Sequence, residues 1–106
     1  MIRVSVLYAT GDGKTFDHDY YVNKHMVLVR ERLGSLGLRR LEVDRGIAGG
    51  APGAAPPYAC AGHLYFDSVE AFRAAMKPHG KELFADVPNF TNIQPFVQIS
   101  EIISQQ

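Results

Sequence analysis

The order of two kinds of periodicity along 106 residues is the feature that most constrains the fold of this chain. Strands are predicted where apolar side chains alternate with other side chains, and helices where apolar side chains recur every three or four residues. The order is strand, helix, strand, strand, helix, strand. It predicts an α+β fold in which a four-stranded antiparallel sheet carries both helices on one face. The predicted strands cover residues 2–8, 38–47, 58–66 and 96–103.

The first helix is predicted over residues 16–33. Thr15 is its candidate N-cap, and Gly34 follows its last turn as a stop signal. His18 and His25 fall at the edge of the helix face that we expect to meet the sheet. The core stripe on that face is Val22, Met26, Val29 and Leu33.

The second helix is predicted to start at Asp67, because Glu70 stands three residues later in the pattern of a capping box. Pro78 and Gly80 are expected to interrupt this helix, since proline cannot donate the backbone hydrogen bond that a helix interior requires. A further short helical stretch is predicted over residues 81–86.

Neither face of the predicted sheet is cleanly polar. Ile2 and Val4 fall on one face, whereas Leu7 and Tyr65 fall on the other. Two helices cover only one face, and an exposed apolar face is unusual for a monomer. We therefore expect residues 1–106 to form a single domain that pairs with a second copy as a homodimer.

The composition excludes several classes of partner. Eleven basic and eleven acidic residues cancel, so the phosphate-neutralising excess of a nucleic-acid binder is missing, as is a polybasic patch for membranes. No apolar run approaches the ~20 residues of a membrane span. The single cysteine, Cys60, allows no intramolecular disulfide, and we expect it to be an unreactive residue that fills apolar space. These features predict a cytoplasmic protein in a reducing compartment, with no nucleic-acid or membrane partner.

Residues 46–57 are rich in Gly, Ala and Pro and contain few large apolar side chains. They are predicted to form a surface loop that is more mobile than the sheet, serving as a lid or as an arm at a dimer edge. The alternative is a mobile hairpin extension without a role. The glycines of this segment do not open a helix, so they do not form a dinucleotide-binding turn.

His25 is the leading candidate for chemistry. Histidine titrates near neutrality, and Tyr21 lies one helical turn earlier, where its hydroxyl could orient the ring. At the edge of the core stripe, His25 can reach a cleft between helix and sheet and act there as an acid or base. The alternative is a half-buried histidine that hydrogen-bonds a backbone carbonyl.

The other candidates are less specific. His79 follows the expected helix break and is a second candidate acid or base, or an ordinary partner of the helix dipole. Asn89 and Asn92 precede the last strand and are candidate substrate anchors, or simple loop caps. Three further side chains are candidates for substrate binding, with structural roles as the alternative: His18 near the helix start, and His63 and Tyr65 on one strand face.

Neither a metal nor a cofactor is expected. His18 and His25 lie seven residues apart, about 10 Å along a helix axis, which is too far for them to share one ion easily. No clustered carboxylates, nucleotide-binding turn or Gly-x-Ser-x-Gly elbow occurs. The sequence thus gives no direct support for hydride transfer by a bound nicotinamide or flavin.

Three segments together resemble one family. Residues 16–26 contain an aromatic residue at a helix start and then Tyr-x-x-x-His, formed here by Tyr21 and His25. With residues 67–72 and 88–95 and the Gly-rich central loop, this is similar to the EthD family, named for ethyl tert-butyl ether degradation. The similarity extends over almost the whole chain. One departure is Val27, which stands where the family usually has proline.

The resemblance implies a ferredoxin-like βαββαβ subunit that pairs into a dimeric α+β barrel and binds its ligand between sheet and helices. It implies an oxidoreductase or reductase-type activity, or a cofactor-free proton transfer, on a small apolar or aromatic catabolic intermediate. Fold alone does not decide between these activities. A non-catalytic binding or scavenging protein of a degradation pathway is the alternative. A haem-using relative would need His63 or His79 as the axial ligand.

Overall fold

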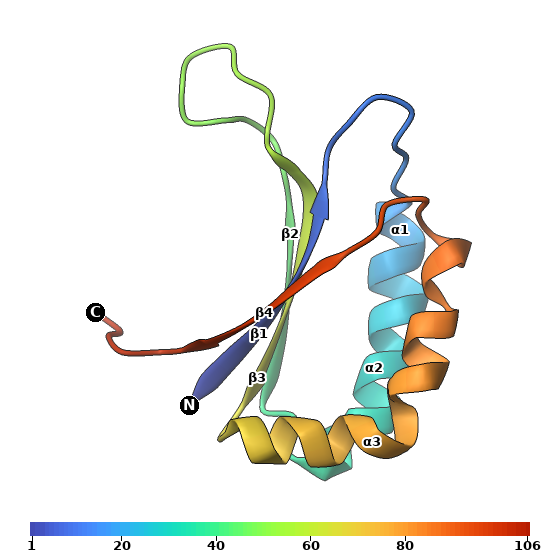
Figure 1. Cartoon of the computed structure of the whole chain (residues 1–106), viewed down its shortest axis with the longest axis vertical. Helices are drawn as coiled ribbons and strands as arrows, with labels where there is room; N and C mark the ends of the chain where they lie inside the picture. The colour runs from blue at the N-terminus through green and yellow to red at the C-terminus, as the bar shows by residue number, and fades with distance from the viewer.

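A computed structural model describes all residues from 1 to 106 and shows a twisted antiparallel sheet with helices against one of its faces (Figure 1). The strand order is β2-β3-β1-β4, with every neighbouring pair antiparallel. The periodicities predict this antiparallel sheet with its helices on one face, and the family resemblance implies the ferredoxin-like arrangement of its strands. The strands are β1 (Ile2–Ala9), β2 (Arg40–Arg45), β3 (Tyr58–Phe66) and β4 (Phe96–Glu101).

The first helical segment contains a π-helical turn that the sequence pattern does not reveal. Asp17, rather than Thr15, caps its start by accepting a hydrogen bond from the backbone N–H of Tyr20. At the end of the π turn, the N–H of Met26 reaches back five residues to the carbonyl of Tyr21. The elements in order are α1 (His18–Tyr20), the π turn η1 (Tyr21–His25), α2 (Met26–Leu33) and the 3₁₀ turn η2 (Gly34–Leu36).

The π turn corrects the predicted core stripe. One extra residue in a turn rotates the residues before it by about 100° relative to those after it. Val22 is consequently 47% exposed, whereas Tyr21 and His25 are buried in line with Met26. Because the extra residue cannot be read from the spacing of apolar side chains, the predicted helix places His25 too close to the edge.

The second helical segment is one continuous helix, α3 (Val69–Ala85), so the predicted interruption at Pro78 and Gly80 is wrong. The helix instead changes direction near its middle (Figure 1), where Pro78 removes one backbone hydrogen bond. Ser68, not Asp67, provides the N-cap by accepting from the N–H of Ala71. The 3₁₀ turn η3 (Val87–Asn89) follows the helix.

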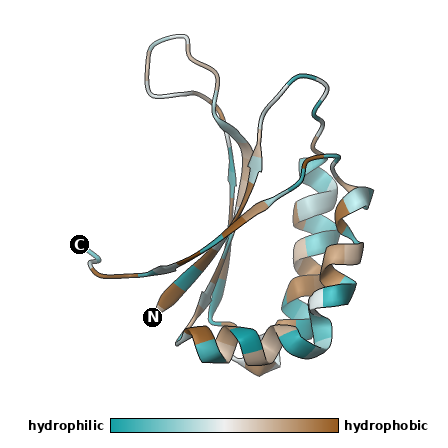
Figure 2. Ribbon diagram, viewed as in Figure 1, coloured by the Kyte–Doolittle hydropathy of each residue, from teal (hydrophilic) through white to brown (hydrophobic).

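The core lies between the helices and the sheet. Figure 2 shows apolar residues on the sides of α2 and α3 that approach the strands. Val4 of β1 pairs with Leu64 of β3, and both side chains are buried beneath the helices. Leu33 and Phe66 are fully buried at the end of α2 and the end of β3. The packing therefore fixes α2 across the sheet and leaves the other sheet face open.

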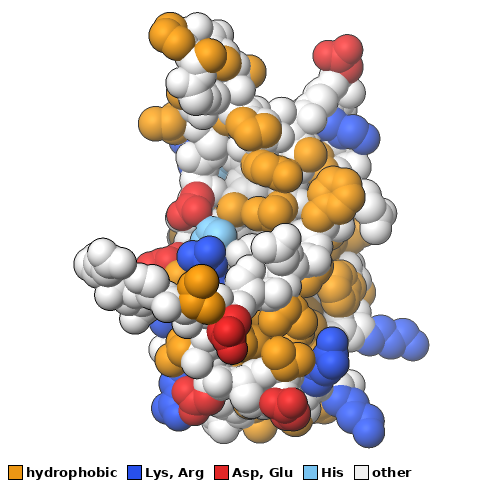
Figure 3. All heavy atoms as spheres, turned by 60° about the vertical axis from the view of Figure 1, so that its left-hand side comes forward, with side chains coloured by type: hydrophobic (Ala, Val, Ile, Leu, Met, Phe, Trp, Pro, Cys, Tyr) orange, Lys and Arg blue, Asp and Glu red, His pale blue; other side chains and the backbone are white.

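That open face is more polar than the sequence analysis predicts. Ser5, His63 and Asp44 lie side by side on β1, β3 and β2 and form a chain of two hydrogen bonds, 2.9 Å and 2.8 Å long. The Tyr65 hydroxyl donates to Glu42 Oε1 at 2.7 Å on the same face. Figure 3 shows a histidine and charged side chains beside a group of hydrophobic ones. The strand period assigns each residue to a face of the sheet, but it does not show which polar side chains on neighbouring strands hydrogen-bond to one another.

Residues 46–57 form an extended loop between β2 and β3 that projects beyond the sheet (Figure 1). Its base is closed by hydrogen bonds from Gly46 N–H to the Ala59 carbonyl and from Thr10 N–H to the Pro57 carbonyl. Ile47, the last residue of the predicted second strand, is 86% exposed because β2 ends at Arg45. The surface-loop prediction is confirmed, whereas its mobility stays a prediction.

Candidate functional site

A small apolar cavity of about 60 Å³ lies between the sheet and the helices. Ten of its eleven lining residues are hydrophobic, and the eleventh is His25. The sheet, α2 and α3 each contribute to the wall, so the cavity is enclosed by all the main layers of the fold. Representative wall residues are Val6 and Leu64 from the sheet, Met26 and Val29 from α2, and Leu83 and Phe84 from α3.

His25 is placed at this cavity by the π turn and is held by a carboxylate. Its Nδ1 lies 2.9 Å from Oδ2 of Asp86. An ionised carboxylate only accepts hydrogen bonds, so Nδ1 carries the proton and donates. No protein group hydrogen-bonds Nε2, and no polar side-chain atom of the chain is both fully buried and unpaired. In the neutral ring, Nε2 is therefore a free basic lone pair at an apolar cavity.

Asp86 stands at the C-terminal end of α3 and is fixed by two more donors. The Tyr20 hydroxyl donates to Oδ1 at 2.7 Å, and Asn89 Nδ2 donates to the same oxygen at 2.9 Å. Burial works to raise the pKa of Asp86. The hydrogen bonds from Asn89, Tyr20 and His25 outweigh burial and hold the pKa below its usual range. Asp86 is thus a fixed negative charge behind His25.

Aromatic rings enclose the imidazole. Tyr21 stacks on His25 with ring centres 5.3 Å apart and an angle of 14°, and the Phe90 ring lies 4.7 Å away. Burial raises the pKa of both Tyr21 and Tyr8 above the usual range of phenols. Both tyrosines therefore stay neutral beside the ionised Asp86.

Gly62 on β3 provides the room for this ring stack. A Cβ atom at position 62 would collide with the Tyr21 hydroxyl and come within 2.9 Å of the Met26 methyl. Because Tyr21 stacks on His25, the absence of a side chain at Gly62 also sets where the imidazole lies. The glycine is thus part of the support of the site, although it carries no functional group.

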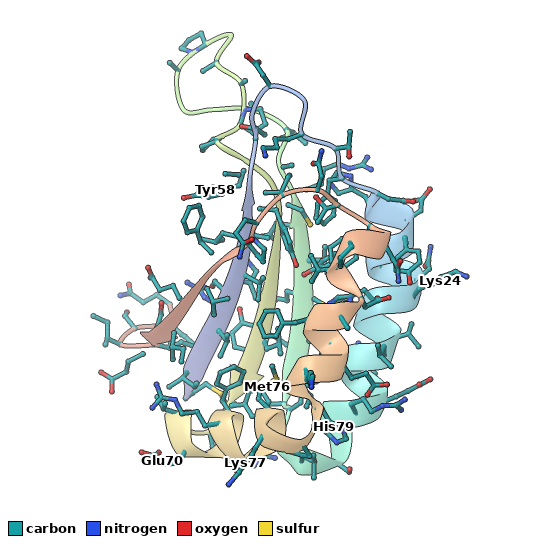
Figure 4. The ribbon with its side chains drawn as sticks, turned by 45° about the vertical axis from the view of Figure 1, so that its right-hand side comes forward. Lys24, Tyr58, Glu70, Met76, Lys77 and His79 are labelled. Atoms are coloured by element: carbon teal, nitrogen blue, oxygen red, sulfur yellow. The ribbon has the colours of Figure 1, made fainter.

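The structure brings together only some of the residues predicted from the sequence. His25 and Tyr21 both line the cavity, and Asn89 joins them through Asp86. His79 lies at the bend of α3 (Figure 4) and does not line the cavity. The proposed roles of these residues stay predictions.

The remaining candidates lie elsewhere. His18 Nε2 is 3.0 Å from the Ala59 carbonyl and ties the start of the helical segment to β3. His63 and Tyr65 lie on the open sheet face, away from the cavity. Asn92 holds a turn together, accepting from Thr15 N–H and donating to the Gly13 carbonyl, each at 2.9 Å.

Sequence reasoning missed Asp86 and Tyr20 as site residues. Asp86 lies 61 residues from His25 and looks like an ordinary residue at a helix end. The available signal was that a helix ending at Asp86 beside the first helix would bring this carboxylate toward His25. Without the π turn and the bend in α3, that proximity is not visible.

The chain has no preformed metal site or membrane helix. No group of three or more His, Cys, Asp or Glu side chains is arranged to hold a metal ion. None of the helices combines the length and the apolar character needed to cross a bilayer.

Comparisons with solved structures agree with this fold. An EthD-like protein from Ralstonia eutropha JMP134 is 42% identical and superposes with a TM-score of 0.92, covering 99% of this chain and 94% of that one. An ethyl tert-butyl ether degradation (EthD) family protein from Bacillus halodurans C-125 is 26% identical, with a TM-score of 0.74 and coverage of 97% and 99%. A dimeric ferredoxin-like protein from an uncultured marine organism, 13% identical with a TM-score of 0.57 and coverage of 100% and 98%, shares the fold alone.

No curated protein sequence matches the chain. The EthD domain matches residues 12–94, a range that includes the helical segment with His25, the central loop, α3 and Asp86. The resemblance carried by residues 16–26, 67–72 and 88–95 is thereby confirmed. The chain belongs to the EthD family.

Proposed function

We propose that the protein is a small-molecule enzyme in which His25 transfers a proton to and from a ligand held in the apolar cavity. The observation that carries this proposal is the pairing of His25 Nδ1 with Asp86 while Nε2 has no protein partner. Because no side-chain nitrogen or oxygen of the chain is both fully buried and unpaired, the unpartnered Nε2 is an accessible atom that a ligand can reach. The family membership and the EthD-like neighbours support a small-molecule site in general terms.

The proposed step is a proton relay. His25 Nε2 accepts a proton from an acidic C–H or O–H of the ligand, and the C–H or O–H electron pair stays on the ligand as the conjugate base. The imidazolium that forms is stabilised by the Asp86 carboxylate at 2.9 Å. Nε2 then returns the proton to another atom of the ligand, so the protein ends unchanged and no electron acceptor is needed.

The surroundings favour an apolar ligand. The wall is hydrophobic apart from His25, and the two neighbouring phenols remain neutral. A small apolar or aromatic molecule with one acidic hydrogen fits this chemistry, because only one basic atom of the wall is free to contact it.

A non-catalytic binding protein is the second candidate. The same apolar wall would hold a hydrophobic intermediate without changing it. Exchange of ligand hydrogens with solvent separates the two functions, because only a proton-transferring site labels the ligand with deuterium.

The test is deuterium incorporation followed by NMR. A panel of small aromatic ketones and enol lactones is incubated with the protein in D₂O. We expect at least one member to exchange its acidic hydrogen faster with wild-type protein than with His25→Gln. His79→Gln is the matched control, since His79 does not line the cavity. Binding of panel members without any His25-dependent exchange would contradict the enzyme and support the binding protein.

We also propose that the chain forms a homodimer through its open sheet face. Phe96 at the start of β4 pairs with Leu7 on that face and is 62% exposed, so its ring would gain cover from a second copy. Several polar side chains of the face are already hydrogen-bonded to one another, so burying them would leave few of their polar atoms unpaired; they are Ser5, His63, Asp44, Tyr65 and Glu42. A similar fold occurs in the dimeric ferredoxin-like protein of the marine organism. Sedimentation should give about twice 11.7 kDa at micromolar concentration, and a stable monomer would contradict the proposal.

A further inference from the structure

The cavity beside His25 is too small for most organic ligands in the form seen here. Its volume is about 60 Å³. An apolar cavity that holds benzene in another protein measures about 150 Å³. A ligand of that size must therefore displace part of the wall, and the most exposed residue of the wall is the natural one to move.

Phe84 is that residue. It lies in the last turn of α3, lines the cavity and is 54% exposed. A half-exposed ring has fewer packing contacts to lose than a buried one, so it moves at low cost. Met26 and Leu83, by contrast, are buried parts of the same wall.

A wide groove lies on the other side of Phe84. It measures about 540 Å³, and Phe84 and Val87 line both the groove and the inner cavity. Displacing Phe84 would join the two spaces. The groove is lined further by the segment that leads into β4, including Ile93 and Pro95.

The groove differs from the cavity in its charge. Lys14 is the one charged residue of its lining, and no acidic residue is among the nine. No ion pair joins Lys14 to a carboxylate, so its ammonium group is free to meet a ligand. Asn92 is occupied in holding the turn near Lys14, which fixes the backbone under the lysine.

We propose that the ligand is an elongated monoanion, with an apolar or aromatic end in the cavity at His25 and a carboxylate-like end in the groove against Lys14. Phe84 is the gate between the two ends. This inference deepens the proposed function, on whose cavity it rests, by naming the class of ligand. Each part of the ligand meets the matching chemistry: a hydrophobic wall at one end and an unpaired cation at the other.

The test uses matched pairs of ligands. ω-Phenylalkanoates with chains of two to six methylenes are compared by calorimetry with their uncharged amides at low ionic strength. We expect at least one carboxylate to bind about two- to fivefold more tightly than its amide, the range of an exposed ion pair. Lys14→Gln should remove this preference and leave the amide unaffected, whereas Lys77→Gln, a lysine at the α3 bend outside the groove, should preserve it.

The gate is tested by kinetics. Phe84→Ala should raise the association rate of carboxylate and amide together by about threefold or more, because no ring has to move. The inference is overturned if no carboxylate binds more tightly than its amide, if Lys14→Gln weakens both equally, or if Phe84→Ala leaves association unchanged. Since no readout here is proton exchange, loss of exchange activity in the His25 test would refute the enzyme without deciding this binding test.

Discussion

Two histidines of this chain each pair with an aspartate, yet they sit in opposite surroundings. On the helix-covered side of the sheet, His25 contacts Asp86 at 2.9 Å; on the open face, His63 contacts Asp44 at 2.8 Å. His63 uses its second nitrogen to accept from the Ser5 hydroxyl, whereas the second nitrogen of His25 has no protein partner. A histidine–aspartate pair is therefore not itself evidence of chemistry. The free nitrogen at a cavity is what distinguishes His25.

The two aspartates differ as well. The Asp86 side chain is 15% exposed and receives three hydrogen bonds, whereas the Asp44 side chain is 66% exposed. A buried carboxylate stabilises a neighbouring imidazolium more strongly than one screened by water. The comparison predicts that changes around His25 affect reactivity and that equal changes around His63 do not.

The largest expected difference is between the two histidines themselves. His25→Gln should lower turnover of an exchanging ligand by about 10²–10⁴-fold, because the proton-accepting atom is lost. His63→Gln should change it by less than about twofold, since His63 lies outside the cavity. Initial rates of deuterium exchange measure both. Equal losses of turnover in the two variants would contradict a special role for the unpartnered Nε2 of His25.

The aspartates provide the next largest contrast. Asp86→Asn removes the charge that stabilises protonated His25, and turnover should fall by about tenfold to hundredfold, the equivalent of one charge-assisted hydrogen bond. Asp44→Asn is the control of equal chemistry on the open face and should leave turnover within about twofold. Unchanged turnover in Asp86→Asn would show that proton transfer by His25 does not need the charge of Asp86.

The support beneath the site gives a third, smaller effect. Gly62→Ala places a methyl group against the Tyr21 hydroxyl and should cost about 1–3 kcal/mol of unfolding free energy through overpacking. It should also move the His25 ring, which stacks on Tyr21. Urea unfolding together with the NMR shifts of His25 measures both consequences. An unchanged stability would mean that the core opens around position 62 without strain.

The smallest effect concerns acid stability. Because the pKa of Asp86 is lower in the folded chain, its ionised form stabilises the fold above the ordinary carboxyl range, near pH 4, and this contribution is lost as the pH falls through the folded pKa. Unfolding free energies of wild-type protein and Asp86→Asn should thus differ most at pH 7 and converge below about pH 4. If the difference in unfolding free energy between the two proteins grew as the pH fell, a lowered pKa of Asp86 in the folded chain would be contradicted.

The order of strands and helices along the chain, and the antiparallel sheet with both helices on one face, were predictable from the sequence, because the two element types differ in the period of their apolar side chains. Tyr21 and His25 were predictable as neighbours, since they are four residues apart on one helix. The π turn was not, because one extra residue leaves no mark in the apolar spacing. That omission misplaced Val22 and underestimated the burial of His25.

Long-range partners were the other limit. Asp86 reaches His25 across 61 residues and depends on α3 continuing past Pro78 and bending. The open face posed the same difficulty: the register that sets His63 opposite Ser5 and beside Asp44 is a property of the paired strands. Local patterns identified the histidines, but only the assembled sheet and helices showed which one has a free nitrogen.

The protonation of the His25 ring tests the central claim most directly. Nitrogen-15 NMR of histidine-labelled protein, at a pH where the ring is neutral, reports which nitrogen carries the proton. We expect Nδ1 to be protonated and Nε2 to be unprotonated. The Nε2 signal should shift when a ligand binds in the cavity, and Asp86→Asn should weaken the preference for protonated Nδ1. Two results would contradict Nε2 as the free basic atom of the cavity: a protonated Nε2, or an Nε2 signal that does not shift with any ligand shown to occupy the cavity.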